Sequence, residues 1–246
     1  MARTGRRRGR QSKGRWLKVV VIIALILAAG SLYLVFRPGG FWSPSIRQKP
    51  IILYVNQGNG VVNGSGFGAM LGFASAHGFN TVFFQVYRAG SLLFSPLILQ
   101  SFVNQAHQAG LKIFFAFYIT NSTQKLPISI FGLHEDGVSL DMSSLDVSAQ
   151  QTFLVELKSN FSGETAVTTT NMSSTLKPDL LVLETYSADE NYGAYLQGFV
   201  RSGIVASVGV FDTPNADVYN SQFQYALQNS DGVMVFDYAG LKRAGY

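Results

Sequence analysis

Beyond Pro50 the chain alternates short apolar runs with stretches of helical periodicity, and this order limits the folds open to it. A βαβα order predicts parallel strands in one sheet with helices packed against it. The runs are apolar on both faces, as expected for strands covered on both sides. The predicted strands are Ile51–Val55, Thr81–Tyr87, Leu111–Tyr118, Gly137–Asp141, Thr165–Thr170, Leu180–Thr185, Ile204–Phe211 and Gly232–Tyr238.

The stretches between these strands predict five helices, several with recognisable ends. Asp146 is placed as an N-cap, and Ser95 precedes Pro96 as an N-cap with proline at the first helical position. Gly78 and Gly110 stand where a left-handed C-terminal residue is needed. The predicted helices are Phe67–His77, Pro96–Ala109, Val147–Asn160, Asn191–Arg201 and Ala216–Gln228.

Eight strands alternating with helices favour an α/β fold, a compact (β/α)₈ barrel of the TIM type, with a doubly wound open sheet as the alternative. Residues 50–246 number 197, at the lower end of the range for such barrels, about 200 to more than 400 residues. Only Ala239–Tyr246 follows the last predicted strand, and the link from Thr170 to Leu180 is too short for a helix. We therefore expect the barrel to lack one or two helices, the closing helix among them.

An uncharged apolar segment of 18 residues, Val19–Phe36, precedes the barrel. At about 1.5 Å per residue it just spans a hydrocarbon core of about 30 Å, which favours a transmembrane signal anchor. A cleaved signal peptide is the alternative, since Ala28-Ala29-Gly30 resembles a cleavage site.

Eight of the 19 basic residues fall within the first 18 positions, which predicts a cytoplasmic amino terminus. The predicted order is a basic cytoplasmic tail (1–18), the anchor (19–36), a linker (37–49) and the barrel (50–246). This order predicts a single-pass protein of the cell membrane whose barrel lies outside the cytoplasm.

Charge and residue usage exclude several functions for the barrel itself. From residue 50 onward the chain has eight basic residues and all 14 acidic ones. The resulting net charge of −6 argues against nucleic-acid binding. Cysteine is absent and the three histidines are scattered, so we expect no disulfide, no thiolate chemistry and no metal site. The sequence implies no cofactor and does not fix an oligomeric state.

Acidic, amide and aromatic residues follow the predicted strands, where TIM-type barrels carry their working groups. Acids two strands apart around a ring can come within the roughly 5 to 9.5 Å that glycosidases use, and Asp141 and Glu184 satisfy that spacing. We expect these two as the catalytic pair, with Asp212 and Asp237 as adjacent alternatives. The expected substrate-binding residues are Gln85, Tyr87, Arg88, Tyr118, Asp212 and Asp237.

Five segments carry a resemblance to a known family: Gly78–Arg88, Phe94-Ser95-Pro96, Ala106–Lys112, Asp136–Asp141 and Gly232–Tyr238. They resemble the glycoside-hydrolase-like TIM barrels grouped as hypothetical glycosyl hydrolases, in which Asp136–Asp141 looks like the fourth-strand DGxxxD. The resemblance implies a polysaccharide-acting barrel, with Asp141 the residue most directly carried over. The sequence departs from the family after Asp141, where Met142–Leu145 lacks the Tyr and Arg that often follow.

Each candidate acid also has a structural interpretation. Asp141 can cap the turn into the next helix, although Asp146 is better placed for this. Glu184 can pair with Arg88 across the mouth. Asp212 and Asp237 can serve turns.

Two functions therefore stay open at this point. The first is a membrane-anchored extracytoplasmic glycoside hydrolase that acts on a polysaccharide or surface glycan through its strand-end carboxylates. The second is a catalytically inactive barrel that binds a glycan or a partner protein at the cell surface.

Overall fold

The computed structural model describes residues 48–56, 64–172, 175–186, 197–210 and 216–246. The predicted basic tail, the membrane anchor and nearly all of the linker lie outside these ranges, as does Asp212. Within them, no helix combines the length and apolar character that a membrane crossing requires. Lys49–Tyr246 forms one compact unit.

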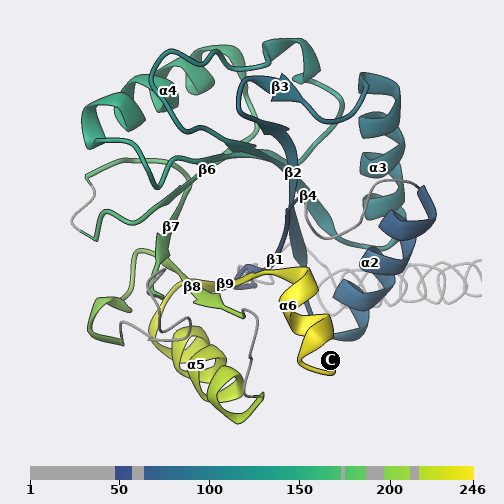
Figure 1. The fold of residues 1–246 in the computed structure, drawn as a ribbon, viewed down its shortest axis with the longest axis vertical. Helices are drawn as coiled ribbons and strands as arrows, with labels where there is room; N and C mark the ends of the chain where they lie inside the picture. The colour runs from purple at the N-terminus through teal and green to yellow at the C-terminus, as the bar shows by residue number, and fades with distance from the viewer. Residues whose placement is uncertain (1–47, 57–63, 173–174, 187–196, 211–215) are drawn as a thin grey trace, which may run out of the picture. The chain divides into compact units, whose positions relative to one another are not determined.

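Eight parallel strands close into a barrel, which confirms the TIM-type prediction over the open sheet (Figure 1). Closure is seen at the first strand, which pairs in parallel with both the second and the last. The barrel strands are β1 (Ile51–Val55), β2 (Thr81–Arg88), β4 (Lys112–Tyr118), β5 (Gly137–Asp141), β6 (Glu164–Thr169), β7 (Leu180–Glu184), β8 (Val205–Gly209) and β9 (Gly232–Phe236).

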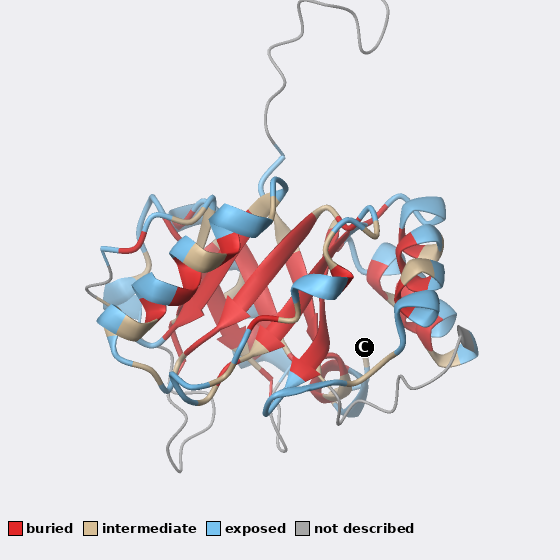
Figure 2. Ribbon diagram, turned by 90° about the horizontal axis from the view of Figure 1, so that it is seen from above, coloured by how far each residue is buried: buried red, intermediate tan, exposed pale blue. Residues whose placement is uncertain are grey.

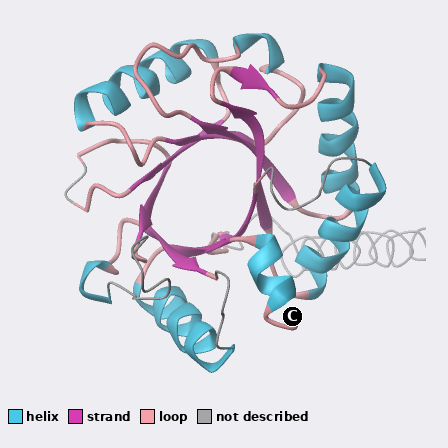
Figure 3. Cartoon of the chain, viewed as in Figure 1, coloured by secondary structure: helices cyan, strands magenta, loops and turns pink. Residues whose placement is uncertain are grey.

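Helices surround the ring of strands on its outside (Figure 3). They are α2 (Gly64–Ala76), α3 (Pro96–Gln108), α4 (Val147–Asn160), α5 (Ala216–Asn229) and α6 (Tyr238–Arg243), with short 3₁₀ turns η2 (Ile128–Ile130) and η3 (Gln197–Phe199). The predicted cap at Asp146 is confirmed, because its side chain accepts a hydrogen bond from Ala149 N. Gly78 and Gly110 have the expected positive φ angles, 77° and 73°.

Three elements differ from the sequence prediction. Part of the predicted helix Asn191–Arg201 lies outside the described residues, and its described end is only the 3₁₀ turn η3. The expectation that the closing helix is missing is wrong, because α6 follows β9 directly. The helix was not predicted because it is too short to show helical periodicity in the sequence. A two-residue strand, β3 (Ser91–Leu92), folds back on β2 as a hairpin, and it is too short to show strand periodicity in the sequence.

Alternation along each strand separates two apolar regions. One set of side chains fills the barrel lumen, and the opposite set packs between the strands and the helices. Figure 2 shows that the strands are buried. The lumen cluster consists of Ile52, Tyr54, Phe83, Phe114, Ala116, Ala166, Val182, Val205 and Met234. The buried strands thus carry apolar side chains on both faces, as the sequence pattern predicts.

The strand register arranges the lumen side chains in layers, because side chains at one height in a tilted barrel come from alternate strands. Tyr54 of β1 is aligned with Phe83 of β2 and Phe236 of β9, and Asp141 of β5 is aligned with Thr168 of β6. Following these alignments around the barrel gives a layer of Tyr54, Ala116, Thr168 and Ser207. The layer above it, nearest the carboxyl ends of the strands, holds Gln85, Asp141, Glu184 and Phe236.

Gly137 begins β5 at a point where no side chain fits. A Cβ at this position would meet the ring of Phe114 and lie 2.6 Å from the carbonyl oxygen of Glu164. We expect Gly137→Ala to lower the free energy of unfolding of the full-length chain by about 1–3 kcal/mol, as overpacking does. Urea unfolding measures the change.

Gly72 provides the matched control, because it lies in α2 and a methyl group added there would have nothing within 4 Å. Gly72→Ala should raise the free energy of unfolding by up to about 1 kcal/mol, through helix propensity alone. Equal unfolding midpoints for Gly137→Ala and the wild type would contradict the tight approach of β5 to its neighbours.

Candidate active site

Two carboxyl groups meet in the uppermost lumen layer. Asp141 ends β5 and Glu184 ends β7, two strands further around the barrel, as the sequence analysis expects. Ser143, just beyond β5, lies between them: its Oγ is 3.3 Å from Asp141 Oδ1 and 2.7 Å from Glu184 Oε1. These two carboxyl oxygens are therefore no more than about 6 Å apart, within the range of paired glycosidase acids.

Asp141 is held in a buried position that disfavours its charged form. The residue is 6% exposed, and Tyr54 Oη donates a hydrogen bond to its Oδ2 at 3.2 Å from across the lumen. Burial, followed by the nearby negative charge of Glu184, raises the pKa of Asp141 to about 7, although the Tyr54 and Ser143 hydrogen bonds oppose the rise. Asp141 therefore keeps a proton at pH values where an ordinary aspartate has lost it.

Glu184 is half-buried, and burial raises its pKa as well, while the Ser143 hydroxyl partly offsets the rise. The Ser143 hydroxyl has a single hydrogen and two lone pairs, so it can donate to only one carboxyl at a time. The shorter contact favours donation to Glu184. A protonated Asp141 can then donate to Ser143 Oγ, so that one proton serves the pair with Glu184 as its ionised member.

Aromatic side chains form one wall of this site. The rings of Tyr54 and Phe236 have centroids 4.9 Å apart, and those of Tyr186 and Phe236 lie 6.2 Å apart. Burial, and then the nearby carboxylates, raise the pKa values of Tyr54 and Tyr186 well above their ordinary range, so both hydroxyls remain protonated donors. The site thus combines two acids, two phenol hydroxyls and an apolar ring face.

The other predicted site residues divide into two groups. Gln85 is buried in the same layer as the two acids. Tyr87 instead turns outward, packs with the core between strands and helices, and donates to the carbonyl oxygen of Lys125. Arg88 is exposed and lies over the ring of Tyr118, 5.6 Å from its centroid. No ion pair joins Arg88 to Glu184 in the described part of the chain.

Asp237 performs the turn role that the sequence analysis considers for it. Its Oδ1 accepts from Gly240 N at 2.8 Å as the N-cap of α6, and its Oδ2 accepts from Asn56 Nδ2 at 2.7 Å. Asp136, the first acid of the DGxxxD segment, also has structural partners, because its Oδ2 contacts Ile113 N and His107 Nε2 at 2.8 and 2.9 Å. Asp136 directly precedes the first residue of β5, whereas Asp141 is the last residue of that strand.

The sequence analysis did not select four residues of the site, Tyr54, Ser143, Tyr186 and Phe236. Tyr54 lies inside β1, and only the alternation of that strand together with barrel closure turns it into the lumen. Ser143 is noted in the sequence only as part of a departure from a family pattern, and its bridging position depends on the turn after β5. In the described ranges, no three histidine, aspartate or glutamate residues lie close enough to hold a metal ion.

Comparisons with known proteins support the fold. No protein-family model matches the chain and no curated protein matches it, so the resemblance to the hypothetical glycosyl hydrolases stays a prediction. The solved spore cortex-lytic enzyme SleL of Bacillus cereus is similar, with a TM-score of 0.52 and 10% identity, over 80% of this chain and 73% of that chain. An HpcH/HpaI aldolase of Desulfitobacterium hafniense DCB-2 matches with a TM-score of 0.47 and 8% identity, over 79% and 88% of the two chains. The likeness to SleL supports the barrel fold alone.

The raised pKa of Asp141 predicts a pH-dependent stability. The folded chain retains a proton at Asp141 that the unfolded chain releases, so this contribution is fully present below about pH 4 and is lost as the pH rises to about 7. The loss is on the order of 4 kcal/mol at most. Urea unfolding of full-length Asp141→Asn should therefore show a smaller decline in stability between pH 4 and 7 than the wild type.

Asp146→Asn is the matched control, because this exposed residue caps α4 and asparagine also caps helices. It should keep the wild-type pH dependence. An Asp141→Asn profile parallel to the wild type would mean that Asp141 titrates as an ordinary aspartate.

Proposed function

We propose that this barrel is a glycoside hydrolase that acts outside the cytoplasm on a polysaccharide or surface glycan. The observation that carries the proposal is the pair Asp141 and Glu184, bridged by Ser143 at the carboxyl end of the barrel. Glycoside hydrolysis requires one protonated and one ionised carboxyl group flanking the bond that breaks. The predicted anchor, Val19–Phe36, supports the proposed location.

Asp141 is assigned the role of general acid, because its raised pKa keeps the proton that the leaving oxygen must receive. Glu184, the better acceptor for the Ser143 hydroxyl, is assigned as the nucleophile. The separation of at most about 6 Å between their facing oxygens favours a retaining reaction, in which the acids lie about 5–5.5 Å apart.

The reaction then proceeds in two balanced steps. Asp141 gives its proton to the glycosidic oxygen as the carbon–oxygen bond breaks, and Glu184 forms a covalent bond to the anomeric carbon. Water next attacks that carbon and loses its proton to Asp141, which releases Glu184 as a carboxylate and regenerates the enzyme. Tyr54 and Tyr186, as protonated phenols, supply hydrogen-bond donors beside the reacting groups.

Reducing-end release from a broad glycan panel tests this proposal with the full-length protein. Asp141→Asn and Glu184→Gln should each lower the rate by about 10²-fold or more, because each removes a group that acts on the reacting bond. Asp146→Asn and Glu156→Gln make the same chemical changes on α4 or its cap and should keep wild-type activity. Product release by intact cells would place the barrel outside the membrane.

A noncatalytic glycan-binding barrel is the second candidate, and one observation favours it. The Ser143 side chain lies between the two carboxyl groups, and Asp141 is nearly inaccessible. This candidate predicts that a panel glycan binds the wild type and Asp141→Asn equally and that no product forms. Hydrolysis that is lost in both acid variants would exclude it.

A further inference from the structure

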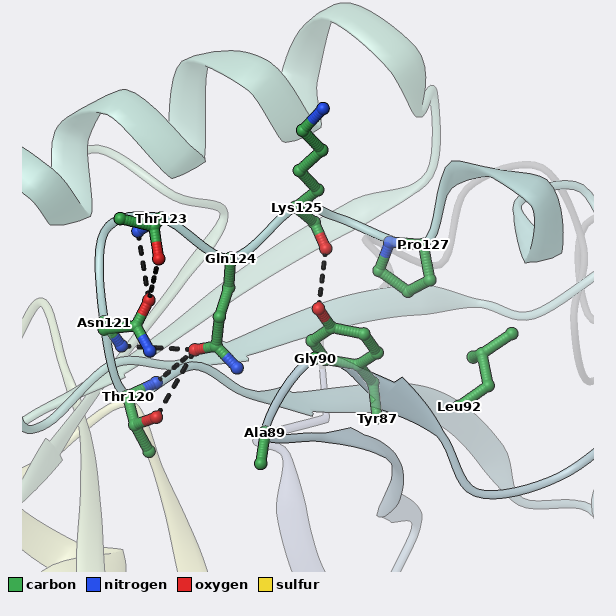
Figure 4. A pocket seen from close by; sticks show the side chains of 10 residues that line it. All are labelled: Tyr87, Ala89, Gly90, Leu92, Thr120, Asn121, Thr123, Gln124, Lys125 and Pro127. Carbon is green, nitrogen blue, oxygen red and sulfur yellow. Dashed lines mark hydrogen bonds between the residues drawn. The ribbon is translucent and has the colours of Figure 1, made fainter.

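A pocket lies beside the mouth of the barrel, between the β2–β3 hairpin and the loop that follows β4 (Figure 4). Its volume is about 670 Å³, within the usual range for small-molecule sites, roughly 300–1,000 Å³. It is lined by Tyr87, Ala89, Gly90, Leu92, Thr120, Asn121, Thr123, Gln124, Lys125 and Pro127. None of the groups that form the Asp141–Glu184 site belongs to it.

The amide of Gln124 has a fixed orientation in this pocket. Its Oε1 accepts hydrogen bonds from the backbone N–H groups of Thr120 at 2.6 Å and Asn121 at 3.1 Å. A flipped amide would turn its NH₂ group against these two donors, so Nε2 must be the end that points away from them. That Nε2 is buried and has no hydrogen-bond partner. A buried donor without a partner costs free energy, and an acceptor on a ligand would remove that cost.

Asn121, in the same loop, leaves a second amide donor for a ligand. Asn121 Oδ1 accepts from Thr123 N at 3.0 Å and from Thr123 Oγ1 at 2.7 Å, which leaves Asn121 Nδ2 as the other end of that amide. The Tyr87 hydroxyl donates to the carbonyl oxygen of Lys125 at 2.7 Å, so one backbone acceptor is also occupied. Figure 4 shows these bonds along the loop.

The charge of the lining residues also favours a ligand that accepts hydrogen bonds and carries negative charge. Lys125 is its only charged residue, and no aspartate or glutamate lines the pocket. This differs from the barrel as a whole, since residues 50–246 carry 14 acidic side chains against eight basic ones. A ligand group that suits this pocket therefore accepts several hydrogen bonds and carries negative charge, as a carboxylate does.

The loop that forms the pocket follows β4, the strand next to the one that ends in Asp141. Thr120 follows Ile119, whose backbone N–H donates to the carbonyl oxygen of Asp141 at 2.9 Å. Tyr118 of β4 is aligned with Asp141 of β5, so the loop that forms the pocket leaves the barrel one strand away from Asp141. Neighbouring strands are about 4.8 Å apart, so we expect a glycan chain of several units to extend from the catalytic pair to this pocket.

We propose that this pocket is a subsite for a carboxylate-bearing sugar, such as a uronic acid unit, next to the bond that is cleaved. This inference rests on the proposed function and narrows its substrate class to acidic glycans. Gln124 Nε2 and Asn121 Nδ2 donate to the carboxylate, and Lys125 adds electrostatic attraction.

Binding of glucuronate, glucose and inorganic phosphate to the full-length protein tests the proposal by NMR titration. Glucuronate should bind more tightly than either of the others. Gln124→Glu keeps an oxygen for the two backbone N–H groups but replaces the donor with a carboxylate oxygen, and should weaken glucuronate binding at least tenfold. Asn121→Asp keeps its bonds to Thr123 and should act in the same direction.

Gln224→Glu on α5 adds the same charge on an exposed surface that does not line the pocket, and should leave glucuronate binding unchanged. Phosphate binding as tight as glucuronate, or undiminished glucuronate binding in Gln124→Glu, would overturn the subsite. Asp141→Asn separates the two proposals. If Asp141→Asn abolishes hydrolysis but keeps glucuronate binding, the proposed hydrolase and the proposed subsite are both supported. If the protein hydrolyses only neutral glycans and Gln124→Glu does not change that rate, the hydrolase is supported and the subsite is contradicted.

Discussion

Closure of the sheet is the constraint on which the rest of this structure depends. When β1 pairs with both β2 and β9, the tilted strands must place side chains from alternate strands at the same height. Asp141 and Glu184 come from strands two apart and so meet in one layer. An open sheet would leave the two acids on a surface, and neither would be desolvated to the same degree.

Burial and charge then act on this pair in the same direction. Desolvation raises the pKa of both acids, and the charge of Glu184 raises that of Asp141 further, so the pair favours a state with one proton. Ser143 links the two groups, and its shorter contact favours Glu184 as the acceptor of its hydrogen bond. The chemical asymmetry that the proposed hydrolysis requires is therefore present before any substrate binds.

The sequence predicts the barrel well because its strands are apolar on both faces and glycines end its helices. All eight barrel strands overlap the predicted ranges, and β1 and β5 are predicted without error. The short elements α6 and β3 could not be predicted, since neither is long enough to show a period. The strand-end acids were recognisable from their position alone, whereas Tyr54 and Ser143 join the site only through closure and the turn after β5. Position next to a strand does not by itself identify a catalytic acid. Asp237 caps α6 and Asp136 accepts a hydrogen bond from a backbone N–H group.

Carbon-13 NMR titration of the aspartate and glutamate carboxyl groups tests the central claim most directly. The account predicts one carboxyl group with a pKa near 7 in the wild type that is absent in Asp141→Asn. In Glu184→Gln that pKa should fall, because the neighbouring negative charge is removed. Titration of every carboxyl group below about pH 5 in the wild type would contradict the shared proton, and with it the assignment of Asp141 as the acid.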